Sequence, residues 1–309
     1  MSDKCILALG FFDGVHMGHA ALLQACVNLA QENNCRPGVV TFKNHPDKLV
    51  MGTEPGLINT LADRERLLRQ NGMEEIIVFP FDRKLKAMPW RDFIAMLVER
   101  HHAAGFVCGE DFHFGKQGQG RAELLQQACA EMGIPCKVVP EQQIDGVTVS
   151  STHIRHLVEI GQMSQAVKYL GHPYVLTGKV VHGFQLGRKL GIPTANLMLP
   201  KELVVPKFGV YAAIAIVDGQ RYCAVTNVGT RPTVAGIGIT VETWILDYSG
   251  NLYGKEITLE FHQFIRTERK FTSLEAMRHE IFHNADEARE ILKERLQFPP
   301  CTGEKNVVK

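Results

Sequence analysis

The chain lacks an excess of charge of either sign, and it lacks any long apolar run. Its 309 residues include 34 Lys and Arg against 33 Asp and Glu, which leaves a net charge of +1. Because positive and negative residues are so evenly balanced, the protein has no global electrostatic field that would hold DNA, RNA or an anionic membrane. No stretch approaches the ~18 uncharged apolar residues of a membrane helix, and the opening MSDKC lacks the basic start of a secretion signal. We therefore expect neither a nucleic-acid partner nor a membrane partner.

Cysteine is present but scattered. The eight cysteines form no C-x-x-C pair and no Cys/His group at zinc spacing. This distribution is typical of buried thiols in a reducing compartment, so we expect a cytoplasmic protein. The chain also contains no G-x-x-x-x-G-K-[ST] sequence, which excludes a kinase of the P-loop type.

The pattern of apolar and polar residues along the chain changes near residue 171. Before that point, short apolar runs alternate with helical stretches, as in a parallel sheet with helices on both faces. The predicted strands are Cys5–Leu9, Gly38–Phe42, Glu75–Pro80, Gly105–Cys108 and Cys136–Val139. The predicted helices are Ala20–Asn33, Ala62–Asn71, Trp90–Arg100 and Arg121–Met132. We expect a Rossmann-like α/β domain over residues 1–171, with ligands at the carboxyl ends of its strands.

From Tyr174 onward, β-branched segments follow one another with short turns. The predicted strands are Val175–Val181, Gly209–Val217, Tyr222–Val228, Thr240–Leu246 and Glu256–Phe264. Such a pattern favours a mostly antiparallel β-domain, a small barrel, over residues 172–298. We expect a helix after Ser273, another from about Asp286 to Leu296, and a tail over 299–309.

Residues Gly10 to His19, with the sequence GFFDGVHMGH, connect the first predicted strand to the first predicted helix. A Gly-rich turn at a helix N-terminus offers backbone N–H groups and the positive end of the helix dipole to an anion. His16 and His19 are three residues apart, so both rings can reach the same oxygens. The pattern predicts a site that stabilises charge on a phosphate under attack. An Asp-Gly turn explains Asp13 better than a catalytic role.

Three more polar segments follow strands or open a helix in the same half. They are Val40–Pro46 with His45, Gly109–Gly115 ahead of a Gly-rich loop, and Ser150–Arg155. The last segment offers two hydroxyls and a guanidinium, which suit phosphate oxygens. Alternatives stay open, because His45 can be an ordinary loop histidine and one of the hydroxyls can be a helix N-cap.

In this order, the motifs GxFDGVHxGH, TFxxHP, GxDFxFG and SSTxIR resemble the adenylyltransferase half of the bacterial bifunctional riboflavin kinase/FAD synthetases. The resemblance implies that His16 and His19 bind the nucleotide phosphates and stabilise the pentavalent transition state. The phosphate cradle would then include Gly10, Phe11 and Gly18. The resemblance also places Asp111 in the Mg²⁺ and flavin region. The residues implied near the ATP phosphates are Ser151, Thr152 and Arg155.

This half also departs from the family pattern. Asn44 stands where proline is common, His113 and His153 stand where arginine is common, and Gly118 occupies a loop position often held by arginine. Neutral imidazole is a poor substitute for a permanent bidentate cation. We therefore expect adenylylation that is reduced or altered rather than abolished.

A long loop from Gly178 to Asn196 reads GKVVHGFQLGRKLGIPTAN. Its glycines, among them Gly183 and Gly187, permit close approach of the backbone to a phosphate, and Arg188 supplies charge. Thr194 and Asn196 offer neutral oxygens, which suit a Mg²⁺ ion already shared with ATP phosphates and water. The alternative is a surface loop with a Pro-Thr turn, which a spacing this detailed disfavours.

Glu242 is the other unusual residue of the second half. Alternation along its predicted strand places Glu242 on one face with Trp244 and Leu246, and Val241 and Thr243 on the other. A carboxylate in an apolar row lies at a barrel mouth or is paired. It is either a solvated edge residue or a base that accepts a proton from a hydroxyl attacking a γ-phosphate.

The second half resembles the riboflavin kinase family through VxHGxxLGRxLGIPTAN, PxxGVYA, TNVGTRPT, VET and FIRxExxF. The resemblance implies a six-stranded antiparallel barrel with a terminal helix, in which Thr194 and Asn196 hold Mg²⁺-ATP. It implies that Glu242 is the base on the ribityl 5′-hydroxyl, and that Arg269 and Phe271 border the flavin.

Both halves thus predict a two-step enzyme. Riboflavin and ATP give FMN and ADP in the barrel, and FMN and ATP then give FAD and pyrophosphate in the α/β domain, with Mg²⁺ in both steps. One alternative is a riboflavin kinase with a weak or inactive adenylyltransferase half. Another is a regulator that binds flavin and nucleotide without turnover. The sequence leaves the oligomeric state open.

Overall fold

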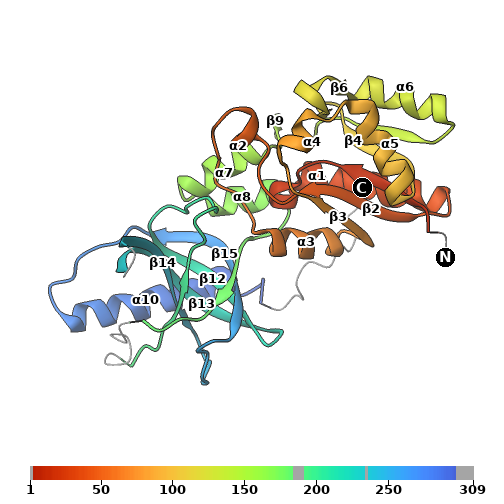
Figure 1. Ribbon diagram of the computed structural model, residues 1–309. Coiled ribbons are helices and arrows are strands. Elements are labelled where there is room, and N and C mark those ends of the chain that lie inside the picture. The colour runs from red at the N-terminus through yellow and green to blue at the C-terminus, as the bar shows by residue number, and fades with distance from the viewer. Residues whose placement is uncertain (1–2, 184–190, 234–235, 297–309) are drawn as a thin grey trace. The chain divides into compact units, whose positions relative to one another are not determined.

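The computed structural model describes residues 3–183, 191–233 and 236–296 (Figure 1). The chain forms two compact units, and the first comprises the segments up to Leu57 and Arg64–Ser151. The second comprises Ile58–Asp63 and, within the described residues, the chain from Thr152 onward. Residues 152–171, expected in the first domain, therefore group with the second unit. The limits 1–171 and 172–298 stay a proposal about which residues serve each half.

The first unit is built on a five-stranded sheet in the order β3-β2-β1-β4-β7. All four pairings between its neighbouring strands are parallel, which confirms the predicted sheet. The strands are β1 (Cys5–Leu9), β2 (Arg36–Phe42), β3 (Glu75–Phe79), β4 (Ala103–Gly109) and β7 (Cys136–Val139). The chain leaves β1 toward β2 on one side and places β4 on the other, so the strand order reverses between β1 and β4.

Helices cover both faces of this sheet because the side chains of β1 alternate between two apolar clusters. Ile6 and Ala8 lie in one cluster with buried residues of α1 (Met17–Glu32) and α3 (Leu61–Gln70). Leu7 and Leu9 lie in the other with residues of α5 (Trp90–His101) and α6 (Ala122–Met132). Shorter elements complete the unit: η1 (Asp13–Val15), α2 (Asp47–Val50), α4 (Arg83–Ala87), β5 (His113–Phe114), η2 (Lys116–Gly118), β6 (Gly120–Arg121), β8 (Gln143–Ile144) and β9 (Val147–Thr148).

The second unit contains a six-stranded antiparallel barrel in the order β10-β15-β12-β13-β14-β11. Its strands are β10 (Tyr174–Lys179), β11 (Ala195–Met198), β12 (Gly209–Val217), β13 (Gln220–Thr233), β14 (Gly236–Ile245) and β15 (Glu256–Arg266). After β10, the backbone N–H of Val181 donates to the carbonyl of Asn196 in β11 at 2.8 Å, so the barrel is nearly closed. The predicted barrel is confirmed. The short strand β11 was expected as part of a loop.

Among the described residues, three helices accompany the barrel: α7 (Ser151–Glu159), α8 (Met163–Leu170) and α10 (Leu274–Leu292). Ser273 is the N-cap of α10, and its hydroxyl accepts from the backbone N–H of Ala276 at 3.1 Å. The helix lies along the barrel and runs through Asp286 without a break, so the second helix expected there is wrong (Figure 1). It continues because Ala285 and Ala288 pack in one apolar cluster with Val210 and Ile214 of β12. No helix of the described residues is both long enough and apolar enough to cross a membrane.

Candidate functional sites

A cavity of about 230 Å³ lies where the strand order of the first unit reverses. Ligands of open α/β sheets bind at this position because the loops after neighbouring strands part there. The loop after β1 leads to His16, Gly18 and His19, and the loop after β4 contributes Gly109 and Asp111. Ser150 and Ser151, at the start of α7, also line it, as do Glu141, Gln142 and Thr148. Three of the four predicted polar segments thus meet at this sheet edge, whereas the segment Val40–Pro46 with His45 does not line the cavity.

His16 and His19 form a stacked pair at the start of α1. Their ring centroids are 3.6 Å apart with an angle of 11° between the planes. His16 is the N-cap of the helix, and its Nδ1 accepts from the backbone N–H of His19 at 3.2 Å. Because this nitrogen accepts, a neutral His16 carries its proton on Nε2. The helix therefore begins three residues before the expected Ala20.

The environment of His19 disfavours its cationic form. Burial, then the neighbouring His16 and then the Arg64 guanidinium lower the pKa of His19 well below its usual value. No hydrogen-bond partner for its buried Nδ1 occurs among the residues that the structure describes. These surroundings favour the neutral imidazole form of His19.

The turn before these histidines has an uncommon backbone. Phe12, Gly14 and Val15 have φ values of 60°, 82° and 41°. A Cβ on Gly10 would lie 3.0 Å from the Phe12 ring. Phe11 does not line the cavity; its ring contacts His45 edge-on, with 4.7 Å between centroids. Asp13 is buried in the turn, and its carbonyl accepts from the Ser151 hydroxyl at 2.9 Å.

Asp111 lies on the β4 side of the same cavity. A Cβ on Gly109 would be 2.7 Å from Oδ1 of Asp111, so this carboxylate occupies space that only glycine leaves open. Beyond it, Nδ1 of His113 lies 2.7 Å from the Asp111 carbonyl. A Cβ on Gly118 would be 3.6 Å from that of His113. His113 and Gly118, two of the positions where arginine is common in the family, are therefore neighbours.

Of the predicted phosphate ligands in the fourth motif, Ser151 lines this cavity. Thr152 and Arg155 follow on α7 and belong to the second unit. Nη1 of Arg155 donates to the Thr152 hydroxyl at 3.4 Å. His153 contacts Tyr169 edge-on, with 4.8 Å between ring centroids.

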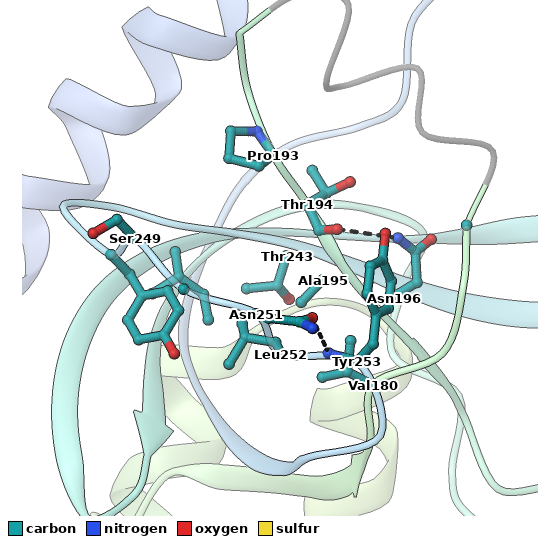
Figure 2. Close-up of a pocket in the computed structure, with 14 residues that line it drawn as sticks. Val180, Pro193, Thr194, Ala195, Asn196, Thr243, Ser249, Asn251, Leu252 and Tyr253 are labelled. Carbon is teal, nitrogen blue, oxygen red and sulfur yellow. Dashed lines mark hydrogen bonds between the residues drawn. The ribbon is translucent and has the colours of Figure 1, made fainter.

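The barrel has a cavity of about 400 Å³ lined by Thr194 and Asn196 (Figure 2). The Asn196 amide is buried, and its Nδ2 donates to the Thr194 carbonyl at 3.4 Å. A Cβ on Gly183 would lie 2.6 Å from Nδ2 and 2.7 Å from Oδ1 of Asn196, so only glycine fits there. Across the cavity, Oδ1 of Asn251 accepts from the backbone N–H of Tyr253 at 3.1 Å. Gly187 and Arg188 lie outside the described residues.

A second barrel cavity, of about 350 Å³, contains Glu242. On β14, Glu242 is the register partner of Asn196 in β11 and of Asn227 in β13. Trp244 lines this cavity, whereas Thr243 and Ile245 line the first, which agrees with the predicted alternation. Arg269 and Phe271 lie in the same lining, together with residues of α10. Thr194 lines both cavities.

Several residues of these cavities were not found from the sequence. Nδ2 of Asn227 donates to Glu268 at 3.0 Å, and both line the Glu242 cavity. Nε of Arg266 donates to Asn284 of α10 at 3.0 Å in the same lining. His182 stacks on Tyr253 beside the other cavity, with 3.9 Å between centroids. Asn227 lies in the motif TNVGTRPT, so its place opposite Glu242 in register could have been inferred from the sequence. No local sequence pattern indicates the contact between Arg266 and Asn284.

These features define the class of protein. The α/β sheet has a histidine pair at its switch point, the position where the strand order reverses. The barrel has a carboxylate between two amides. This combination is typical of a phosphate-handling transferase with two sites. The FAD synthetase family profile matches residues 1–153, and the riboflavin kinase profile matches residues 170–292. The chain belongs to the family of bifunctional riboflavin kinase/FMN adenylyltransferases. This confirms the predicted pairing of a kinase domain with an adenylyltransferase domain.

Relatives match along almost the whole chain. The bifunctional riboflavin kinase/FMN adenylyltransferase of Escherichia coli K12 is 36% identical over 291 residues, which cover 93% of each chain. The Bacillus subtilis protein of the same description is 32% identical over 290 residues, or 92% of each chain. A crystal structure described as a macrolide-efflux protein from Streptococcus pneumoniae has a TM-score of 0.83 at 29% identity. That likeness covers 94% of this chain and 95% of the other.

Proposed function

We propose that the protein converts riboflavin to FMN in the barrel and FMN to FAD in the α/β unit, with one ATP consumed in each step. The observation that carries the proposal is the arrangement around Thr194, which lines both barrel cavities. One cavity contains Asn196 and the other contains Glu242, its register partner. A nucleotide and an acceptor hydroxyl can thus meet from opposite sides.

In the kinase step, the ribityl 5′-hydroxyl attacks the γ-phosphorus of ATP. Glu242 accepts the hydroxyl proton, the new O–P bond forms, and the bond to the β-phosphate oxygen breaks to release ADP. Arg269 and Phe271 border the flavin in this assignment, and residues of α10 line the same cavity.

Thr194 and Asn196 fit a Mg²⁺ ion that ATP brings with it. Their donors are two neutral oxygens, and the space that Gly183 leaves open around the Asn196 amide is a cradle that a Cβ would fill. Such a donor set suits an ion that takes its other ligands from phosphate and water. When bound, the ion neutralises polyphosphate charge. In the α/β unit, Asp111 is the proposed carboxylate ligand.

In the adenylyl step, a phosphate oxygen of FMN attacks the α-phosphorus of ATP, and pyrophosphate leaves. In this assignment Gly18 lines the phosphate cradle and Gly10 and Phe11 belong to the turn that leads to it, while His16 and His19 donate to the oxygens that gain charge. Ser151, Thr152 and Arg155 bind the ATP phosphates in this assignment, as do Gly183, Gly187 and Arg188 in the barrel. We place both steps in the cytoplasm.

A product time course from riboflavin and Mg²⁺-ATP tests the proposal. FMN should appear first, and FAD should follow at its expense. Accumulation of FMN with no FAD would favour the kinase-only alternative, for which the arginine-poor positions 113 and 118 are the supporting observation. Tight flavin binding without turnover of either step would favour a regulator.

A further inference from the structure

Arg64, at the start of α3, is a buried cation that the mechanism above does not use. Its side chain has 0% exposure, although a guanidinium keeps its charge at any physiological pH. Nη1 donates to the Phe11 carbonyl at 2.8 Å and to the Thr41 hydroxyl at 3.4 Å. The Thr41 hydroxyl itself donates to the same Phe11 carbonyl at 2.7 Å. Two donors from α3 and β2 thus hold one carbonyl of the turn after β1.

The rest of the guanidinium is not neutralised by direct bonds. Its carbon lies 4.4 Å from the centroid of the Phe11 ring, which is a cation–π contact. Nε and Nη2 are buried, and neither has a hydrogen-bond partner among the described residues. Burial lowers the pKa of Arg64, and the nearby Asp13 partly restores it. Burying a charge in this way is costly, and an apolar residue would fill the space at lower cost.

We propose that Arg64 is a positioning residue for adenylyl transfer, which fixes the Phe11 carbonyl and so aims the turn and the histidine pair at the phosphates. Phe12, Gly14 and Val15 all have positive φ values, which glycine adopts readily but Phe12 and Val15 do not. The turn therefore needs such an anchor. The inference rests on the proposed adenylyl step and deepens it.

The charge of Arg64 gives the proposal a readout that a purely structural contact would not move. The groups that face His19 are His16, the Phe12 ring and Arg64, and Asp13 lies beside Arg64. Asp111 and Glu141 line the same cavity. After burial and the neighbouring His16, Arg64 is the third influence that lowers the pKa of His19. We therefore expect Arg64→Met to raise that pKa and to move the limb of the pH–rate profile that reports His19 to higher pH.

The experiment compares Arg64→Met, Arg64→Lys and Thr41→Val with the wild type in the full chain. In Arg64→Met, we expect the kcat for FMN to FAD to fall by about 10- to 100-fold, as for a small misplacement of reacting groups. The pH limb should also move upward. Thr41→Val removes one anchor without a change of charge, so kcat should fall by about 3- to 10-fold with the pH limb in place. Arg64→Lys should keep the pH limb and lose rate, because an ammonium lacks the planar fork.

The riboflavin kinase rate of each variant is the internal control, and it should stay at the wild-type value. An Arg64→Met protein with unchanged FAD kcat and unchanged pH profile would overturn the inference. If the wild type itself makes no FAD, the proposed adenylyl step fails instead. NMR titration of the His19 ring in the wild type and in Arg64→Met then still decides, since an unchanged pKa in Arg64→Met overturns the inference. Should Arg64→Met fail to fold, the FAD kcat values of Arg64→Lys and Thr41→Val decide, and wild-type values in both would overturn the inference.

Discussion

Asn44 replaces a proline that is common in the family motif, and the structure gives it a local task. Its Nδ2 donates to the Phe81 carbonyl at 3.0 Å, and its Oδ1 accepts from the Phe81 backbone N–H at 3.1 Å. The side chain thus joins the segments that follow β2 and β3 through two reciprocal hydrogen bonds. Proline could make neither bond, so this departure is explained by structure rather than by loss of chemistry.

We expect Asn44→Ala to lower the free energy of unfolding of the α/β unit by about 1–3 kcal/mol, since each of the two bonds contributes about 0.5–1.5 kcal/mol. Urea unfolding measures the change. Asn28→Ala is the matched control, because the single hydrogen bond that Asn28 accepts from Gln24 is fully exposed. Equal stability of the two variants would show that the bridge to Phe81 contributes nothing.

A substitution at His113 tests whether the missing arginines weaken the FAD step. It is exposed beside the Asp111 carbonyl, at the edge of the switch-point cavity. A guanidinium there would carry a permanent charge that can bond a substrate phosphate, so His113→Arg should lower the KM of the FAD step by about 3- to 10-fold. Steady-state kinetics with FMN and with ATP as the varied substrate measure it. His279→Arg, which adds the same charge on α10, should have no effect on this step.

Among the secondary-structure elements, the short strand β11 positions Asn196 in the barrel cavity that we assign to the nucleotide. Its pairing with β14 places Asn196 opposite Glu242, and the bridge from Val181 brings Gly183 against the Asn196 amide. Two sequence motifs, the one with Gly183 and Asn196 and the one with Glu242, thus meet through backbone pairing.

Gly183→Ala should therefore displace the Asn196 amide and lower kcat/KM for ATP in the kinase step by at least tenfold, as a misplaced ligand does. The FAD step should stay unchanged. Gly178→Ala is the control within β10, since its Cβ would meet only the flexible end of Leu197, at 3.2 Å. Wild-type kinase kinetics in Gly183→Ala would contradict the role given to the cradle.

At the scale of the whole molecule, each unit has its own core and its own cavities. Glu242 belongs to the barrel, and His19 belongs to the α/β unit. The two reactions should therefore fail separately when a catalytic group is removed from one unit.

Glu242→Gln should lower FMN formation by about 100- to 10,000-fold, because the amide cannot accept the hydroxyl proton. With FMN supplied, the same variant should form FAD at the wild-type rate. His19→Gln should do the reverse, and a mixture of both variants should convert riboflavin to FAD. Chromatographic separation of the flavins measures all three outcomes. An unchanged kinase rate in Glu242→Gln would remove Glu242 from the mechanism.

Local sequence patterns predict most strands and helices of both halves and the motifs that carry the chemistry, but not β11 or the unbroken α10. Period-2 alternation places Glu242 and Thr243 on opposite faces, and parallel strands bring His16 and Asp111 to one sheet edge, because both rules are local or topological. The contacts without a local sequence signal depend on the folded chain. Arg64 reaches the Phe11 carbonyl, Asn44 bridges to Phe81, and α10 continues past Asp286, since side chains far apart in the sequence pack there.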